Sequence, residues 1–149
     1  MDAVDQLTAW LSPTLARLKP AARAKLLRHI ATGIRRRNMD RIRAQKSPDG
    51  ASWPARKQRP ARRHGIKQKK QMFLKLRQAR HFRINKTPEG LAIGFFGRVA
   101  RIARAHHEGQ FDRVSPDGPF YQYPRRELIG FSADDMRWIE QAVAQFLSE

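Results

Sequence analysis

The chain of 149 residues contains no cysteine. Thiolate chemistry is therefore excluded, together with cysteine-based zinc sites, iron–sulfur clusters and the disulfides that hold small secreted domains together. No apolar run approaches the roughly 20 residues of a membrane-spanning helix. The first residues, Met1-Asp2-Ala3-Val4-Asp5, are acidic where a targeting peptide would be basic. We expect one domain over residues 1–149, in a reducing cytoplasm and without membrane contact.

Acidic residues are missing from one long stretch of the chain. Residues 50–88 hold 13 Lys or Arg and no Asp or Glu, whereas the rest holds 18 basic and 13 acidic residues. Within that stretch, residues 51–71 are polar and interrupted by prolines, so they bury too little apolar surface to order alone. They predict an extended basic arm, which Trp53 anchors on the domain.

Helical periodicity dominates both ends of the chain. Apolar residues at helical spacing predict a helix over residues 2–18, broken or kinked at Pro13, and a second one over residues 19–46. Gly33 weakens the second prediction, because glycine costs about 1 kcal/mol inside a helix. Ser132 and Asp135 form a capping box at the start of a closing helix.

The middle of the chain has the pattern of short strands. Alternating residues predict a hairpin of strands 81–84 and 91–96, joined by a turn over residues 85–90. A one- or two-turn helix is expected at residues 72–76, a basic helix over residues 98–107 ended by Gly109, and a loop or hairpin over residues 110–123. This order predicts an α+β fold, with a small antiparallel β-sheet packed against the N-terminal helices and the C-terminal helix.

Catalytic constellations are poor in this sequence. His106 and His107 are adjacent and diverge on a helix, whereas a chelating pair needs i,i+4 spacing. Asp134 and Asp135 fall in a helix first turn, where the macrodipole explains them. We therefore expect no enzymatic activity, metal or cofactor. A hydrolase using His106 or Asp134 is the weakest of three hypotheses.

The basic arm has two functional interpretations. Its cations could bind phosphates, with Trp53 as a stacking surface, which would make the protein a sequence-nonspecific nucleic-acid-binding module. Alternatively, the arm could order against acidic surfaces of neighbouring proteins in an assembly. Composition alone favours nucleic acid.

Three ordered stretches resemble the virion morphogenesis, or tail completion, proteins of contractile-tailed bacteriophages. They are Arg41-Ile42-Arg43-Ala44-Gln45-Lys46 with Pro48-Asp49-Gly50, then Gly94-Phe95-Phe96-Gly97-Arg98-Val99-Ala100-Arg101-Ile102-Ala103-Arg104-Ala105-His106, then Tyr123-Pro124-Arg125-Arg126-Glu127-Leu128-Ile129-Gly130-Phe131. The likeness runs from about Leu18 to Leu147.

This resemblance implies a structural role in virion assembly. Such proteins cap the head-proximal end of a tail and join it to the head connector, commonly as hexameric rings. Expected partners are further copies of the chain, tail tube, sheath and neck proteins, with DNA contact through basic residues as an additional use. The expected location is the virion tail, after assembly in the host cytoplasm. The expected partner contacts are Trp53, Arg56, Lys57, Arg59, Arg62, Arg63, Arg98, Arg101, Arg104, His106 and Arg126.

Overall fold

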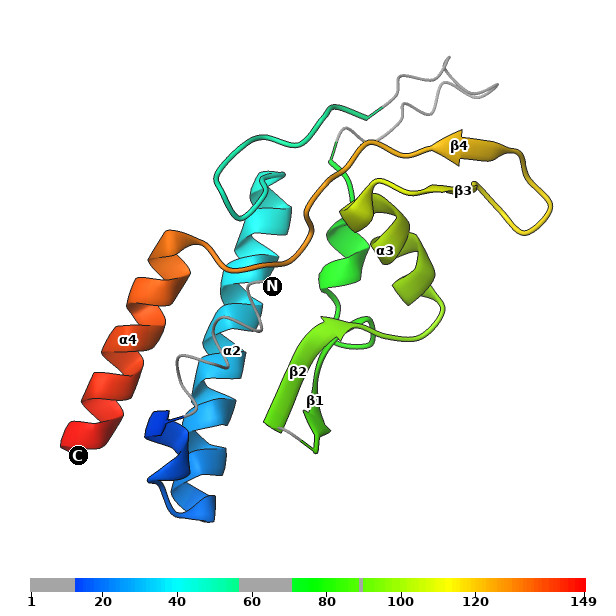
Figure 1. Cartoon of the computed structure of the whole chain (residues 1–149). Coiled ribbons are helices and arrows are strands. Elements are labelled where there is room, and N and C mark those ends of the chain that lie inside the picture. The colour runs from blue at the N-terminus through cyan, green and yellow to red at the C-terminus, as the bar shows by residue number, and fades with distance from the viewer. Residues whose placement is uncertain (1–12, 57–70, 89) are drawn as a thin grey trace.

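The computed structural model describes residues 13–56, 71–88 and 90–149. A central helix, α2, has helix α4 on one side and the hairpin of β1 and β2 on the other (Figure 1). The predicted α+β class is confirmed, with two separate two-stranded antiparallel sheets. After a helical turn at residues 13–16, the elements are α2 (Pro20–Ala44), η1 (Leu74–Arg77), β1 (Phe82–Thr87), β2 (Gly90–Phe95), α3 (Val99–Glu108), β3 (Phe111–Arg113), β4 (Phe120–Gln122) and α4 (Ala133–Ser148).

Helix α2 confirms the predicted second helix and runs without a break through Gly33. Pro20 opens it at a first-turn position, and Gln45 ends it in the left-handed conformation with φ of 59°. The glycine has a packing role. A Cβ added to Gly33 would lie 2.0 Å from Cη2 of Trp138. Gly33 therefore lets the indole of α4 lie directly on the backbone of α2.

The first hairpin has a tighter turn than the sequence predicted. Pairing runs from Phe82 opposite Phe95 to Thr87 opposite Gly90, so most of the predicted turn over residues 85–90 belongs to the strands. Thr87 Oγ1 accepts a hydrogen bond from the Gly90 N–H at 3.1 Å, which closes the hairpin end. The expectation of a six-residue turn was wrong because strand residues with polar side chains read as a loop.

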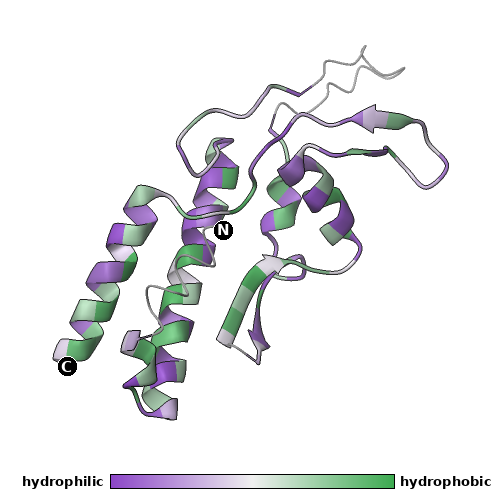
Figure 2. Cartoon of the chain, viewed as in Figure 1, coloured by the Kyte–Doolittle hydropathy of each residue, from purple (hydrophilic) through white to green (hydrophobic). Residues whose placement is uncertain are grey.

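Two apolar clusters form the core. The first joins the N-terminal part of α2 to α4, and the second joins the end of α2 to η1, α3 and the segment before α4. Figure 2 shows apolar residues along β2 and in bands on α2 and α4. The buried residues of the first cluster are Leu15, Leu26, Ile30, Ile34, Ile139 and Val143, and those of the second cluster are Ile42, Trp53, Met72, Leu76, Ala103 and Leu128.

A buried polar group ties α2 to the start of α4. Asp135 is 1% exposed, and its carboxylate pairs with Arg41 at 2.8 Å. Asn38 accepts hydrogen bonds from the Gly130 N–H at 3.0 Å and from Arg41 at 2.8 Å. The predicted capping box with Ser132 is present. Asp135 therefore caps α4 and also forms an ion pair across the helix interface.

The first residues of the predicted arm belong to the body of the protein. Ser52 forms a β-bridge with Lys46, and the Trp53 N–H donates to the Gln45 carbonyl at 3.0 Å. The side-chain amide of Gln45 accepts a hydrogen bond from the Met72 N–H at 2.7 Å and donates one to the Met72 carbonyl at 2.8 Å. Trp53 thus anchors the start of the predicted arm, residues 51–71, through long-range contacts that local polarity conceals in the sequence. Residues 57–70 lie outside the described part of the chain.

Candidate functional site

Helix α3 presents a row of arginines on its outer face. The helix packs Ala103 and Ala105 inward and ends at Gly109, which adopts φ of 66° as predicted. Arg98, Arg101 and Arg104 are exposed, as their i, i+3, i+6 spacing predicts for one helix face. Arg98 and Arg104 form no ion pair within the described residues. They therefore remain charged surface available to a partner.

Arg101, the middle arginine, is fixed to the second hairpin. Its guanidinium donates to both carboxylate oxygens of Asp112, at 3.0 and 2.6 Å. These hydrogen bonds raise the pKa of Arg101 and lower the pKa of Asp112. These two hydrogen bonds join α3 to β3. Because Asp112 compensates its charge, Arg101 contributes less free positive charge to the surface than Arg98 and Arg104 do.

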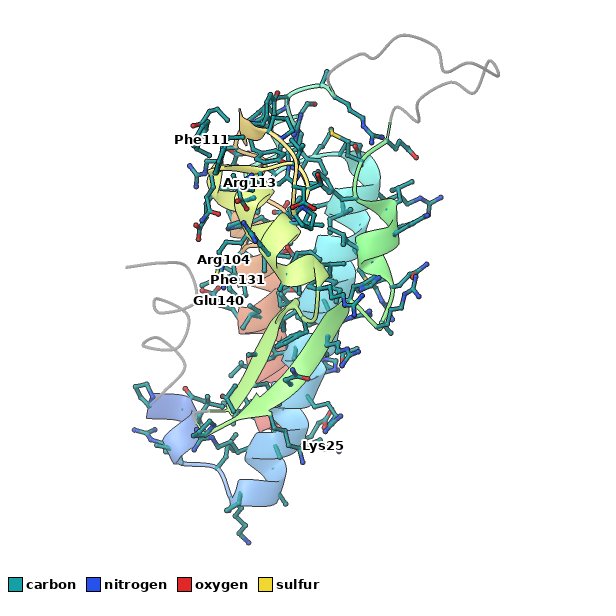
Figure 3. All side chains as sticks on the ribbon, turned by 90° about the vertical axis from the view of Figure 1, so that its right-hand side faces the viewer. Lys25, Arg104, Phe111, Arg113, Phe131 and Glu140 are labelled. Carbon is teal, nitrogen blue, oxygen red and sulfur yellow. The ribbon has the colours of Figure 1, made fainter. Side chains whose placement is uncertain are left out.

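The β3–β4 hairpin carries an exposed aromatic pair that sequence reasoning did not single out. Phe111 and Phe120 are 64% and 53% exposed, and their rings stack at a centroid distance of 5.2 Å. The Arg113 guanidinium lies 4.5 Å from the centroid of the Phe120 ring. Figure 3 shows Phe111 and Arg113 at the same end of the molecule, beyond Arg104 on α3. Each strand spans only three residues, too few to show a period.

The two adjacent histidines are half-buried against neighbouring segments. The His106 ring lies 4.6 Å from both the Phe73 and the Tyr123 ring. Burial, with a smaller contribution from Arg126, lowers its pKa from 6.5 to about 4. His107 Nδ1 accepts the Leu128 N–H at 3.1 Å. Both histidines thus hold the segment before α4, which agrees with the structural role that their spacing favours.

Arg126 and Trp53 fasten two connecting segments to each other. Arg126 is 4% exposed and donates to the carbonyls of Pro54 and Ala55, at 2.9 and 3.1 Å. The indole of Trp53, 7% exposed, donates to the Glu127 carbonyl at 3.1 Å. The interpretation of Trp53 as a stacking surface for bases was wrong, because its ring is buried, whereas its role as an anchor is confirmed.

Of the remaining expected contact residues, the structure describes only Arg56. Arg56 is exposed at the end of the described segment and has interactions of its own. Four others, Lys57, Arg59, Arg62 and Arg63, lie outside the described residues. Asp134 is exposed and pairs with Arg137 in the first turn of α4. Both acids lie in the first turn of α4, as the macrodipole interpretation requires, and Asp135 also takes part in the capping box.

The described residues hold no group of candidate metal ligands and no membrane-spanning helix. No three His, Asp or Glu side chains gather as metal ligands anywhere in residues 13–56, 71–88 and 90–149. Within the same ranges no helix is both long enough and apolar enough to cross a bilayer. The notable surface is the end of the molecule formed by α3 and the β3–β4 hairpin, where free arginines lie beside exposed aromatic rings.

Comparison with known proteins agrees with this picture along nearly the whole chain. Residues 2–148 match the phage virion morphogenesis family. The chain is 32% identical over 138 residues to tail completion protein S of Escherichia phage P2, covering 92% of each chain. No solved structure matches. The chain belongs to the phage virion morphogenesis family.

Proposed function

We propose that this protein is a non-enzymatic tail completion protein, which closes the head-proximal end of a phage tail as a homo-oligomeric ring and joins it to the head connector. The observation that carries the proposal is the similarity to tail completion protein S, which extends over 92% of both chains. Because the match covers the arginine helix, the second hairpin and α4 together, it supports transfer of the whole role.

The surface of the domain suits assembly with other proteins. Arg98 and Arg104 are exposed at the start and in the middle of α3, and Phe111 and Phe120 are exposed on the hairpin that follows α3. Aromatic and arginine side chains are the residues that contribute most to protein interfaces. We assign the free arginines of α3, Arg56 and the basic residues 57–70 to contacts with tail tube, sheath or neck proteins. Trp53, His106 and Arg126 support these contacts by fixing the segments around them.

The decisive experiment removes the gene from the phage genome that encodes it and examines the particles by electron microscopy. We expect unjoined heads and tails, with infectivity restored by the intact gene on a plasmid. Complementation with Arg98→Glu plus Arg104→Glu should restore fewer joined particles. The matched control, Arg36→Glu plus Arg43→Glu, reverses two exposed charges on α2 and should restore them fully.

Two outcomes would contradict the proposal. Normal joined particles in the absence of the gene would show that tails are completed without this protein. Equal complementation by both charge-reversed variants, with both proteins folded by circular dichroism, would remove the α3 arginines from the assembly surface. Either result together with salt-sensitive DNA binding by the purified chain would favour a nucleic-acid-binding module instead.

A further inference from the structure

The β3–β4 hairpin forms a preorganised apolar projection, which we call the knob and define by Phe111, Val114 and Phe120. These three side chains are 64%, 47% and 53% exposed. The strands are only three residues long, and so short a hairpin is unstable alone in water. The exposed rings therefore need a rigid support to be held in place.

That support comes from contacts at both ends of the hairpin. At its base, Arg101 holds Asp112 with two hydrogen bonds, at 3.0 and 2.6 Å. At its turn, the Val114 N–H donates to the Pro119 carbonyl at 3.0 Å. A Cβ on Gly118 would lie 2.4 Å from Ser115 Oγ, so the turn is closely packed. The rings are thus presented at low entropic cost to a partner.

A hollow of about 450 Å³ lies among the residues at the start of α2, the turn of helix before it and the end of the β1–β2 hairpin. Its lining includes the apolar side chains of Leu15, Leu18, Leu27 and Leu91. Three exposed cations, Arg23, Arg28 and Lys86, also line it. This volume is within the range of sites that hold a ligand or side chains.

The knob and the hollow belong to opposite ends of the molecule. The hollow lies beside residues 20–28 of α2, whereas α3, to which Arg101 binds the knob hairpin, packs near Ile42. At 1.5 Å per residue, these two parts of α2 are about 27 Å apart. Figure 3 shows Phe111 toward one end of the molecule and Lys25, on the first turns of α2, toward the other. A knob therefore cannot fill the hollow of its own chain.

We propose that the knob of one copy docks in the hollow of a second copy. Charge supports this occupant at the turn, because the carboxylate of Asp117 is exposed there and the hollow presents three cations, whereas the exposed guanidinium of Arg113 lies over the Phe120 ring. A contact between two different surfaces of identical chains is heterologous, and it generates a ring when the rotation closes. The inference rests on the self-association included in the proposed function and names the surfaces that form it.

The same residues disfavour nucleic acid as the occupant of the knob. The Phe120 ring already has Phe111 stacked on it and Arg113 over it, which leaves little ring face for a base. Asp112 compensates Arg101, and Asp117 at the turn offsets the charge of Arg113, so these residues offer phosphate no net positive charge. An apolar hollow lined by cations suits both the exposed rings of the knob and the carboxylate at its turn.

Cysteine crosslinking tests the contact directly, because the natural chain has no cysteine. The full chain is prepared as Asp117→Cys and, separately, as Lys86→Cys, and the two are mixed under mild oxidation. We expect a disulfide-linked pair that contains one copy of each variant, since a disulfide needs Cα atoms within about 7 Å. Asp117→Cys with Arg36→Cys, which lies outside the hollow, is the control and should give no mixed pair. Absence of the Asp117–Lys86 pair in a chain that still self-associates would overturn the inference.

A second variant tests the energetic role of the knob. Phe111→Ser plus Phe120→Ser should weaken self-association about 30-fold or more, measured by light scattering over a concentration series. Ile102→Ser, which removes a side chain 56% exposed on α3, is the control and should leave association unchanged. Unchanged association of the double variant, or loss of oligonucleotide binding instead, would refute the docking.

Complementation separates this inference from the proposed function. Crosslinking that fails in a chain that completes tails contradicts the docking alone. If the two variants crosslink but deletion of the gene still leaves tails joined to heads, tail completion alone is contradicted.

Discussion

Replacing Gly33 with alanine tests whether the packing of α4 on α2 outweighs helix propensity. Propensity alone predicts stabilisation, because alanine is favoured over glycine inside a helix by about 1 kcal/mol. The structure predicts the opposite sign. The added Cβ would lie 2.0, 2.5 and 2.7 Å from three carbons of the Trp138 ring. These atoms belong to a rigid indole, so the ring as a whole has to move.

The cost of moving the indole follows from its surroundings. Overpacking a core site costs about 1–3 kcal/mol. The displaced ring also weakens its contact with the Arg37 guanidinium, 5.1 Å from the ring centroid, which is worth about 0.5–1 kcal/mol. Subtracting the gain in propensity, we expect Gly33→Ala to lower the free energy of unfolding by about 1–2 kcal/mol. The corresponding fall in Tm is about 2–8 °C.

A double-mutant cycle isolates the clash. In a Trp138→Ala background the space above Gly33 is open, so Gly33→Ala should stabilise the protein by up to about 1 kcal/mol. Urea denaturation followed by circular dichroism gives all four free energies, and the coupling between the two sites should be about 2–3 kcal/mol. If Gly33→Ala stabilises the protein to the same extent in both backgrounds, the proposed contact between the indole and the α2 backbone is refuted.

Three further predictions concern single residues. Asp135→Ala should lower the free energy of unfolding by about 3–5 kcal/mol because it removes a buried carboxylate that both caps α4 and pairs with the partly buried Arg41, whereas the exposed Asp134→Ala should change it by less than about 1 kcal/mol; urea titrations compare them. Trp53→Ala should cost about 3–5 kcal/mol in thermal denaturation, and a loss below about 1 kcal/mol would mean that residues 51–56 are not part of the body. Since the pKa of His106 falls from 6.5 to about 4 on folding, the unfolded chain binds more protons between these values, so stability is complete above pH 6.5 and decreases as pH falls toward 4; urea midpoints of His106→Phe should decrease less over that range.

Local signals in the sequence determine the helices well. Pro20 and the apolar spacing after it predict α2 to within two residues at either end. The Ser132–Asp135 capping box predicts the start of α4, and Gly109 predicts the end of α3. These features depend on neighbours within one or two turns, and such neighbours are visible in the sequence itself.

Features that depend on distant residues could not be predicted in the same way. Gly33 reads as a weakness of the helix until Trp138, more than 100 positions later, is placed against it. Asp134 and Asp135 look alike in sequence, yet only Asp135 meets Arg41. The exposed pair of Phe111 and Phe120 was missed because short strands leave no period and because solvent exposure is a property of the folded surface.

The fastening of residues 53–55 by residues 126–127 has a consequence for synthesis of the protein. Trp53 and its acceptor at Glu127 are 74 positions apart. At about 5–20 residues per second, translation takes about 4–15 s to travel from one to the other. During that interval α2 has been made, whereas Gly130 and Asp135, the partners of Asn38 and Arg41, have not. A nonsense or frameshift mutation before residue 130 therefore yields a chain without Ile139 and Val143 of the first apolar cluster and without the Asp135 partner of Arg41.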